Sequence, residues 1–242
     1  MRVIRFVLAA CVLSIPGPVF AQEWIEFASR DDRFTANFPG QPTIAETAWV
    51  SEYGAALRAR VYSAASGQSR YSVTVVDYNP VERILTEKAK ACPAGAETCR
   101  GIADTGIGYW KNDVRGAIVY ATSKLLQRPG VTLTHMLWNF VDMVAGQQLQ
   151  LTNADGSRTF ASVYMHVNRL IVMEGTVPAA YPEPGLFQQS LGWLDEKGLS
   201  VRYASIYYSD PDLPKPPPRQ RTPQQRDDGR IDAPGATGGQ AR

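Results

Sequence analysis

Cysteine and histidine are scarce in this chain, which has three cysteines and two histidines among 242 residues. A structural zinc site needs about four nitrogen or sulfur ligands, and neither histidine lies near the cysteines in the sequence. The chain also lacks a G-x-S-x-G nucleophile elbow and a glycine-rich phosphate loop with its lysine. These absences leave no catalytic motif, so the sequence predicts neither an enzyme nor a bound cofactor.

Apolar runs long enough to span a bilayer, about 20 residues, are missing as well. The run at 7–15 is shorter, follows two arginines and precedes the compact residues 19–21. This order is typical of a secretory signal peptide. We predict that it occupies residues 1–21, with cleavage between Ala21 and Gln22. The protein is therefore expected in the periplasm or outside the cell, with no membrane span after cleavage.

A lipoprotein signal is the alternative interpretation of the same segment. Residues 8–11 have the sequence Leu-Ala-Ala-Cys, which is similar to a bacterial lipobox and would anchor the protein through Cys11. The apolar run before Cys11 is very short, however, and it continues beyond that residue to Ile15. Cleavage at Ala21 fits this pattern better.

An excess of either charge is the third feature that the chain lacks. It has 25 lysines and arginines against 23 acidic residues, and removal of residues 1–21 takes away Arg2 and Arg5, which leaves 25 − 2 = 23 basic residues. Nucleic-acid binding requires an excess of basic side chains that neutralise phosphates. The formally neutral mature chain is therefore not expected to bind nucleic acid.

Two cysteines remain after cleavage, Cys92 and Cys99, with six residues between them. Thiols pair in the oxidising compartment that an export signal implies, whereas a redox pair usually has two residues between its cysteines. We predict a structural disulfide. Closing so short a loop contributes about 2.5 kcal/mol to the free energy of unfolding by the chain-entropy estimate. This stabilises a local loop but is too little to hold a domain together.

The composition divides the mature chain into two parts. Residues 210–242 are dense in proline, glycine, glutamine and mixed charge, and they contain few apolar residues. Such a segment cannot bury enough surface to offset the entropy of ordering, so we predict a disordered tail that is either inert or used for docking. Residues 22–209 have the size of a single domain.

Alternating apolar residues predict many short strands in this domain. Turn residues at 65–69, at Asp155-Gly156 and at Asn168-Arg169 separate consecutive strands, which indicates antiparallel hairpins. The strands are predicted over residues 23–29, 33–39, 56–64, 70–78, 131–144, 147–154, 158–167, 170–178 and 199–203.

Three helices are predicted between the strands. The first has Asn79 as its N-cap with Pro80 and Glu82 behind it, and it ends at Cys92. The second follows an Asp113 cap and runs to Arg128, although its central residues also allow a strand. The third covers 183–198. The sum is an α+β domain, an antiparallel β-sheet flanked by two or three helices.

Three segments of the sequence resemble secreted proteins with the Mog1/PsbP-like fold. FTANFPGQP at 34–42 is similar to their N-terminal strand, and YMHVNRLIVMEGTVP at 164–178 with LFQQSLGWL at 186–194 is similar to their closing hairpin and helix. The resemblance implies an α/β/α sandwich. It also implies a mostly non-catalytic accessory, adaptor or envelope protein with an unidentified protein or envelope partner, and it transfers no site residue.

The two histidines are the remaining candidates for a metal-binding or catalytic site. His135 and His166 lie in predicted strands that are possible neighbours, and a metal would need them on one face together with ligands such as Asp142 or Glu174. Ordinary strand histidines are the alternative that we prefer. A metal-binding protein or an enzyme using this pair is therefore the least favoured function.

Aromatic residues are numerous enough to form a core or to line an apolar groove between sheet and helix. We expect most of them in the core, and a carrier of a small apolar ligand is accordingly the second hypothesis after the accessory protein. The residues concerned are Tyr109, Trp110, Trp138, Tyr164, Trp193, Tyr207 and Tyr208.

Overall fold

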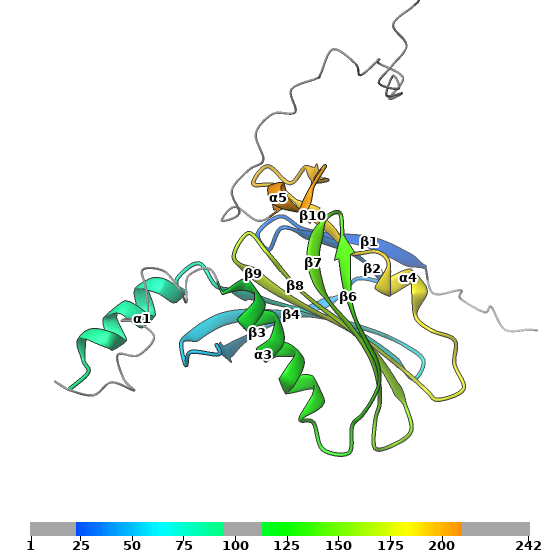
Figure 1. Cartoon of the computed structure of the whole chain (residues 1–242). Coiled ribbons are helices and arrows are strands. Elements are labelled where there is room, and N and C mark those ends of the chain that lie inside the picture. Colours follow the sequence, from blue (N-terminus) through cyan, green and yellow to red (C-terminus); the bar gives the residue numbers. More distant parts are fainter. Residues whose placement is uncertain (1–22, 94–112, 210–242) are drawn as a thin grey trace, which may run out of the picture.

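The computed structural model describes residues 23–93 and 113–209. Strands dominate these residues and form one antiparallel sheet of seven strands in the order β3-β4-β5-β9-β8-β7-β6. A smaller sheet has the order β1-β2-β10-β11. Figure 1 shows the long curved strands of the large sheet with α3 across one face.

The bounds of the elements are as follows. The strands are β1 (Trp24–Ser29), β2 (Phe34–Pro39), β3 (Thr43–Val50), β4 (Ala56–Ser66), β5 (Ser69–Asp77), β6 (Thr132–Val141), β7 (Val144–Thr152), β8 (Arg158–His166), β9 (Arg169–Val177), β10 (Gly192–Leu194) and β11 (Ser200–Val201). The helices are α1 (Val81–Lys90), α3 (Val114–Leu126), α4 (Gly185–Gln188) and α5 (Ile206–Ser209).

Tight turns set the register of the large sheet. The β8–β9 turn places Val167 and Asn168 at φ of 47° and 54°, and the β6–β7 turn places Asp142 and Met143 at 45° and 68°. Positive φ at both central residues is the geometry that matches the twist of a two-residue hairpin. The strand predicted over 131–144 is confirmed as β6, Thr132–Val141, but its predicted end is wrong, because the chain reverses at Asp142 and Met143 and begins β7 at Val144.

Helix α3 covers one face of the large sheet, and a buried apolar cluster that includes Ile118, Leu125, Leu149 and Val163 lies between them. The predicted cap is confirmed, since the Asp113 carboxylate accepts a hydrogen bond of 2.7 Å from the Gly116 N–H. The centre of this segment, whose sequence also allowed a strand, is helical as part of α3.

The other face of the large sheet carries the small sheet and the single turn of α4. Phe38 and Tyr71 make edge contacts with Phe187 of α4, with ring centroids 5.5 and 5.2 Å apart. The predicted α+β class with an antiparallel sheet is confirmed. The predicted α/β/α sandwich is not what the described residues show, because this second layer is mostly strand.

The third predicted helix, 183–198, is wrong over most of its length. Helix ends after four residues at Gln188, and β10 pairs with β2 at Trp193 and Gly192. A side-chain carbon at Gly192 would lie 2.6 Å from the Thr35 hydroxyl. The Thr35 side chain therefore occupies the space that a side chain at position 192 would need, and strand pairing overrides an apolar spacing that also suits a helix.

The first helix begins differently from the prediction. Its N-cap is Pro80, without a side-chain hydrogen bond, and the Asn79 amide instead donates to Asp77 at 2.6 Å. Asn79 is therefore not the cap. The helix ends before Cys92, as expected, and it packs on the α3-side cluster through Val81 and Leu85.

Several predictions fall outside the described residues. The signal peptide 1–21 with its cleavage site and the lipobox Cys11, the partner cysteine Cys99 and the tail 210–242 all lie there, and they stay predictions. None of the described helices is long and apolar enough to cross a membrane.

Candidate functional site

The two histidines are far apart in the sheet. His135 of β6 pairs with Gln150 of β7, which pairs with Phe160 of β8. His166 lies six residues farther along β8, about 20 Å at the usual rise of a strand. The strands are not neighbours, because β7 separates them. Ligand bonds of about 2 Å therefore exclude a metal shared by this pair.

His166 is buried inside the protein, at 2% exposure. Its Nε2 lies 2.8 Å from the Tyr203 hydroxyl, and its ring centroid lies 4.6 Å from that of Trp193. Burial, followed by the nearby Arg169 and Arg33 charges, lowers the pKa of His166 to about 4. The imidazole is thus neutral near pH 7, where it packs between aromatic rings.

The two acidic residues suggested as further ligands are also dispersed. Both Glu174 oxygens accept hydrogen bonds from Arg128, at 2.5 and 3.0 Å. Asp142 lies in the β6–β7 turn, 3.9 Å from Arg202. Within 23–93 and 113–209, no three histidine, cysteine or acidic side chains form a group that could hold a metal ion.

A buried polar network that the sequence did not predict fastens the β1–β2 turn to the large sheet. The Asp32 carboxylate accepts hydrogen bonds from Arg60 at 2.6 Å and from the Tyr62 hydroxyl at 2.5 Å. Burial and the bond to Asp32 raise the pKa of Tyr62 to about 12. The network is closed by its own partners, so it has a structural role.

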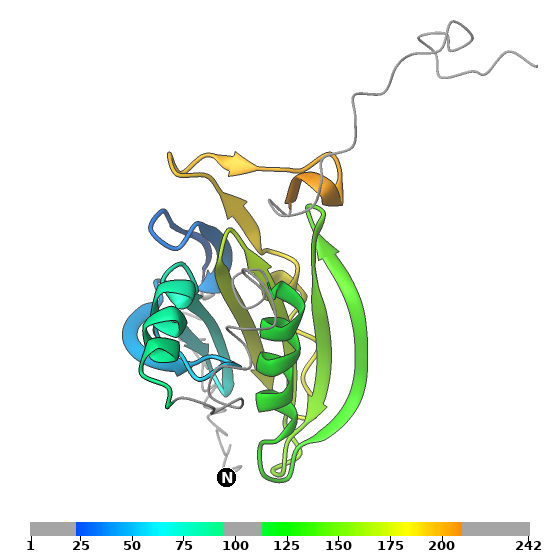
Figure 2. The same ribbon diagram turned by 60° about the vertical axis from the view of Figure 1, so that its left-hand side comes forward.

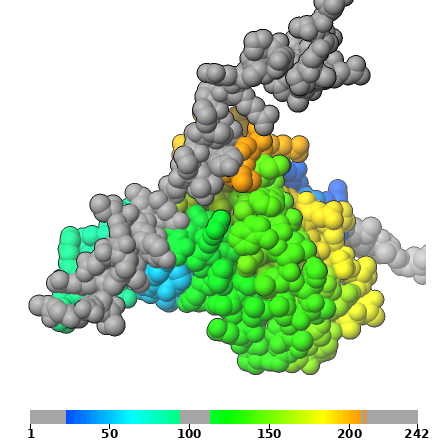
Figure 3. Space-filling view, viewed as in Figure 1, coloured from blue at the N-terminus to red at the C-terminus, as the bar shows by residue number. Residues whose placement is uncertain are grey.

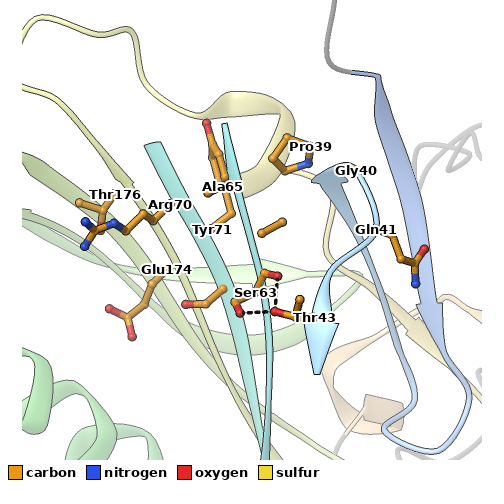
Figure 4. Close-up of a pocket in the computed structure, with 12 residues that line it drawn as sticks. Pro39, Gly40, Gln41, Thr43, Ser63, Ala65, Arg70, Tyr71, Glu174 and Thr176 are labelled. Atoms are coloured by element: carbon orange, nitrogen blue, oxygen red, sulfur yellow. Dashed lines mark hydrogen bonds between the residues drawn. The ribbon is translucent and has the colours of Figure 1, made fainter. Parts of the chain in front are cut away.

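An open cleft of about 850 Å³ lies where β3, β4, β5 and β9 meet the β2–β3 connection. Figure 4 shows Arg70, Glu174 and Thr176 on one side of the cleft and Pro39 to Gln41 on the other. The Thr43 hydroxyl contacts Ser63 Oγ at 3.0 Å. The lining residues are Pro39, Gly40, Gln41, Thr43, Ser63, Ala64, Ala65, Arg70, Tyr71, Ser72, Glu174 and Thr176.

Three hydroxyl side chains and one carboxylate form a continuous row across this cleft. Thr43, Ser63, Ser72 and Glu174 are successive cross-strand partners on β3, β4, β5 and β9. Pro39, Ala64, Ala65 and Tyr71 add apolar surface to the same cleft. The lining is therefore mixed, and it selects neither a polar nor an apolar ligand.

Strand β6 is the edge of the large sheet, and its apolar side chains are exposed. Figure 2 shows β6 at the outer side of the sheet, next to α3, and in the space-filling view β6 and β7 form the outer surface (Figure 3). The large apolar side chains that are exposed on β6 and its turn are Leu133 (42%), Met136 (47%), Leu137 (39%), Trp138 (44%), Phe140 (47%) and Met143 (43%).

Three of these residues share one face of the sheet. Met136 pairs with Leu149, which belongs to the cluster beneath α3, and Trp138 pairs with Gln147, which accepts a hydrogen bond of 2.6 Å from Thr122 of α3. Directly paired residues lie on the same face. Met136, Trp138 and Phe140 therefore form an apolar row beside α3, and we call this row the edge row.

No strand of the described residues pairs with the outer side of the edge row. Val141 and Val144 flank a two-residue turn, so they form the hydrogen-bonded pair that closes it. Asn139 and Leu137 also bond toward β7, because bonded and non-bonded pairs alternate. The N–H and C=O groups of the edge row consequently point away from the sheet.

The exposed edge row partly contradicts the sequence-based expectation for the aromatics. Trp193 and Tyr164 are buried in the core as predicted, at 0% and 1% exposure. Trp138 was expected in the core too, and this is wrong. The remaining aromatics of that set, Tyr109, Trp110, Tyr207 and Tyr208, lie among residues or side chains that the structure does not describe.

Comparisons with known proteins find a likeness of fold. No protein-family model and no curated protein matches the chain. One solved structure that matches is the solution structure of cyanobacterial PsbP (CyanoP) from Synechocystis sp. PCC 6803, with 11% identity, a TM-score of 0.41, and coverage of 75% of this chain and 98% of that chain. The match is to a protein of the group that the sequence resembles, and no ligand, partner or residue role is transferred from it.

Proposed function

We propose that this chain is an exported accessory protein of the cell envelope that acts by binding protein and not by catalysis. The observation that carries the proposal is the open edge of β6, ten residues long, with apolar side chains on both faces. An extended segment that adds to such an edge gains main-chain hydrogen bonds, and its alternate side chains supply specificity.

The composition of β6 supports an edge that binds a partner over an edge that is merely exposed. Natural sheets protect their edges with charged side chains, proline or short strands. β6 contains no proline and no lysine, arginine or acidic residue. The opposite edge, β3, carries Glu46, whose carboxylate bonds to Arg58 of β4. The unprotected edge is therefore confined to one side of the sheet.

The chemistry of the edge row defines the segment that binds it. Its side chains are two aromatic rings and a thioether, which favour apolar and aromatic contacts. The occupant is accordingly an extended, uncharged segment with an apolar residue at every second position.

Photo-crosslinking in the living cell tests this function. A photoreactive amino acid replaces Trp138 in the edge row, and the control places it at Ile44 on β3, where the side chain is 54% exposed. We expect a discrete protein adduct from position 138, including an adduct to the chain itself, and none from position 44. The adduct should survive deletion of 210–242 and disappear with Phe140→Lys. A lack of any protein adduct at position 138 refutes the proposal.

A further inference from the structure

We infer that the segment that binds β6 is β6 of a second copy, so that two large sheets join across a two-fold axis. This inference rests on the proposed function and names the partner of the same edge. The segment that the edge row requires is extended, uncharged and apolar at alternate positions, and β6 has this composition itself. The strand is thus complementary to a second copy of itself.

An antiparallel pairing centred on Trp138 satisfies the outward backbone groups. It places Trp138 opposite Trp138 of the second copy and Met136 opposite Phe140 of the second copy. These residues are the ones whose N–H and C=O groups point outward, so each pair exchanges both of its hydrogen bonds. No bonded position of the edge row is left without a partner.

The side chains of the edge row match in the same register. Indole rings at the axis can pack edge-to-face or offset, and each is flanked by a methionine–phenylalanine pair, a favourable contact between sulfur and ring. The exposed fractions of Met136, Trp138 and Phe140, 47%, 44% and 47%, are available for burial. Pairing two strands without charged residues also brings no like charges together.

The symmetry of the pairing limits the assembly to two copies. A two-fold contact uses the same surface on both chains and therefore closes. The opposite edge does not extend it, because Glu46 and Arg58 form their ion pair on β3 and β4. The inference is thus a discrete dimer and not an open-ended fibre.

The chain's own C-terminal segment is a poorer occupant of the edge. The last described residue, Ser209, lies next to the β6–β7 turn, where its hydroxyl donates a hydrogen bond of 2.8 Å to the Met143 carbonyl. Residues 210–242 are nevertheless rich in proline and charge, and Leu213 and Ile231 are their only large apolar residues. Proline cannot donate to a strand ladder, so this segment does not fit the edge row.

Sedimentation analysis of residues 22–242 over a concentration series tests the dimer. We expect a dimer for the natural sequence and for Ile44→Lys, which changes an exposed residue on the other edge. Phe140→Lys should raise the dissociation constant by at least about 100-fold, since a charge then enters an apolar contact of each copy. Circular dichroism is the control for folding, and we expect a natural spectrum for Phe140→Lys because the Phe140 side chain is 47% exposed.

A cysteine at the axis tests the register of the same dimer. Bonded antiparallel partners have Cα atoms about 5.5 Å apart, within the range of a disulfide. Trp138→Cys should therefore form a covalent dimer under mild oxidation, whereas Ile44→Cys should not. A natural chain that is monomeric at every concentration overturns the inference, as does a dimer that Phe140→Lys leaves intact or that Trp138→Cys fails to link. A monomer that still gives a crosslink from position 138 to another protein leaves the proposed function standing.

Discussion

His166 makes the stability of the protein depend on pH in a window that the structure defines. The pKa of this histidine is about 4 in the folded protein, against an ordinary value of 6.5, mainly because the side chain is buried. Between these values the unfolded chain binds a proton that the folded chain does not bind. The free energy of unfolding therefore falls as the pH drops from 6.5 toward 4.

The magnitude follows from the size of the pKa shift. Each unit is worth about 1.4 kcal/mol, so this one group removes about 3 kcal/mol of stability between pH 7 and pH 4. The charged groups that face the imidazole, Arg169 and Arg33, act in the same direction. Trp193 and Tyr203 complete its surroundings and carry no charge near neutral pH.

Urea unfolding followed by tryptophan fluorescence measures the effect at several pH values from 7 to 4.5. The variant His166→Gln removes the titration, and we expect its stability to fall less steeply with acidification than that of the natural protein. His135→Gln is the matched control, because that side chain is exposed on β6, and it should keep the natural pH dependence. Parallel curves for the natural protein and His166→Gln would refute the reasoning.

Three further changes test other parts of the fold by the same unfolding assay. Asp32→Ala leaves Arg60 and Tyr62 without their acceptor and should lower the free energy of unfolding by about 3 to 5 kcal/mol. The control Asp31→Ala changes a side chain that is 81% exposed and should lower it by less than about 1 kcal/mol. Equal losses would contradict the network. Gly146→Ala places a carbon 2.2 Å from the Tyr164 ring and 2.3 Å from the Val163 carbonyl and should cost at least about 2 kcal/mol. Gly185→Ala has open space there, and a similar loss at both positions would count against the packing of β7 on β8. Reduction of the predicted Cys92–Cys99 disulfide should lower the melting temperature by about 5 to 10 °C, and complete unfolding would contradict a local role.

The central strands were predictable because one physical signal dominated their sequence. β4 and β5 alternate apolar and polar residues across a turn that contains Gly67, with φ of 57°. β3, in contrast, was not predicted. Most of its side chains are exposed on both faces, so burial imposes no alternation on the sequence. β3 is a strand because β4 pairs with it. The residues of β3 alone do not reveal this pairing.

The candidate site was hidden from the sequence for a related reason. An aromatic-rich strand such as β6 has the composition of a core strand. Only the strand order shows that, within 23–93 and 113–209, no further strand lies on the outer side of Trp138. The same order separates His135 from His166, which sequence spacing left as possible neighbours. The partners of Asp32 were hidden in the same way, because Asp32 lies in the β1–β2 turn of the small sheet, whereas Arg60 and Tyr62 belong to β4 of the large sheet.

Amide hydrogen exchange in β6 tests the pairing edge most directly. The amides of Met136, Trp138 and Phe140 point outward, while those of Leu137 and Asn139 bond to β7 and serve as internal controls within the strand. We predict that the three outward amides become protected as the protein concentration rises, whereas the two controls are protected throughout. Rapid exchange of the outward amides at every concentration, with the controls protected, would contradict a second copy on this edge.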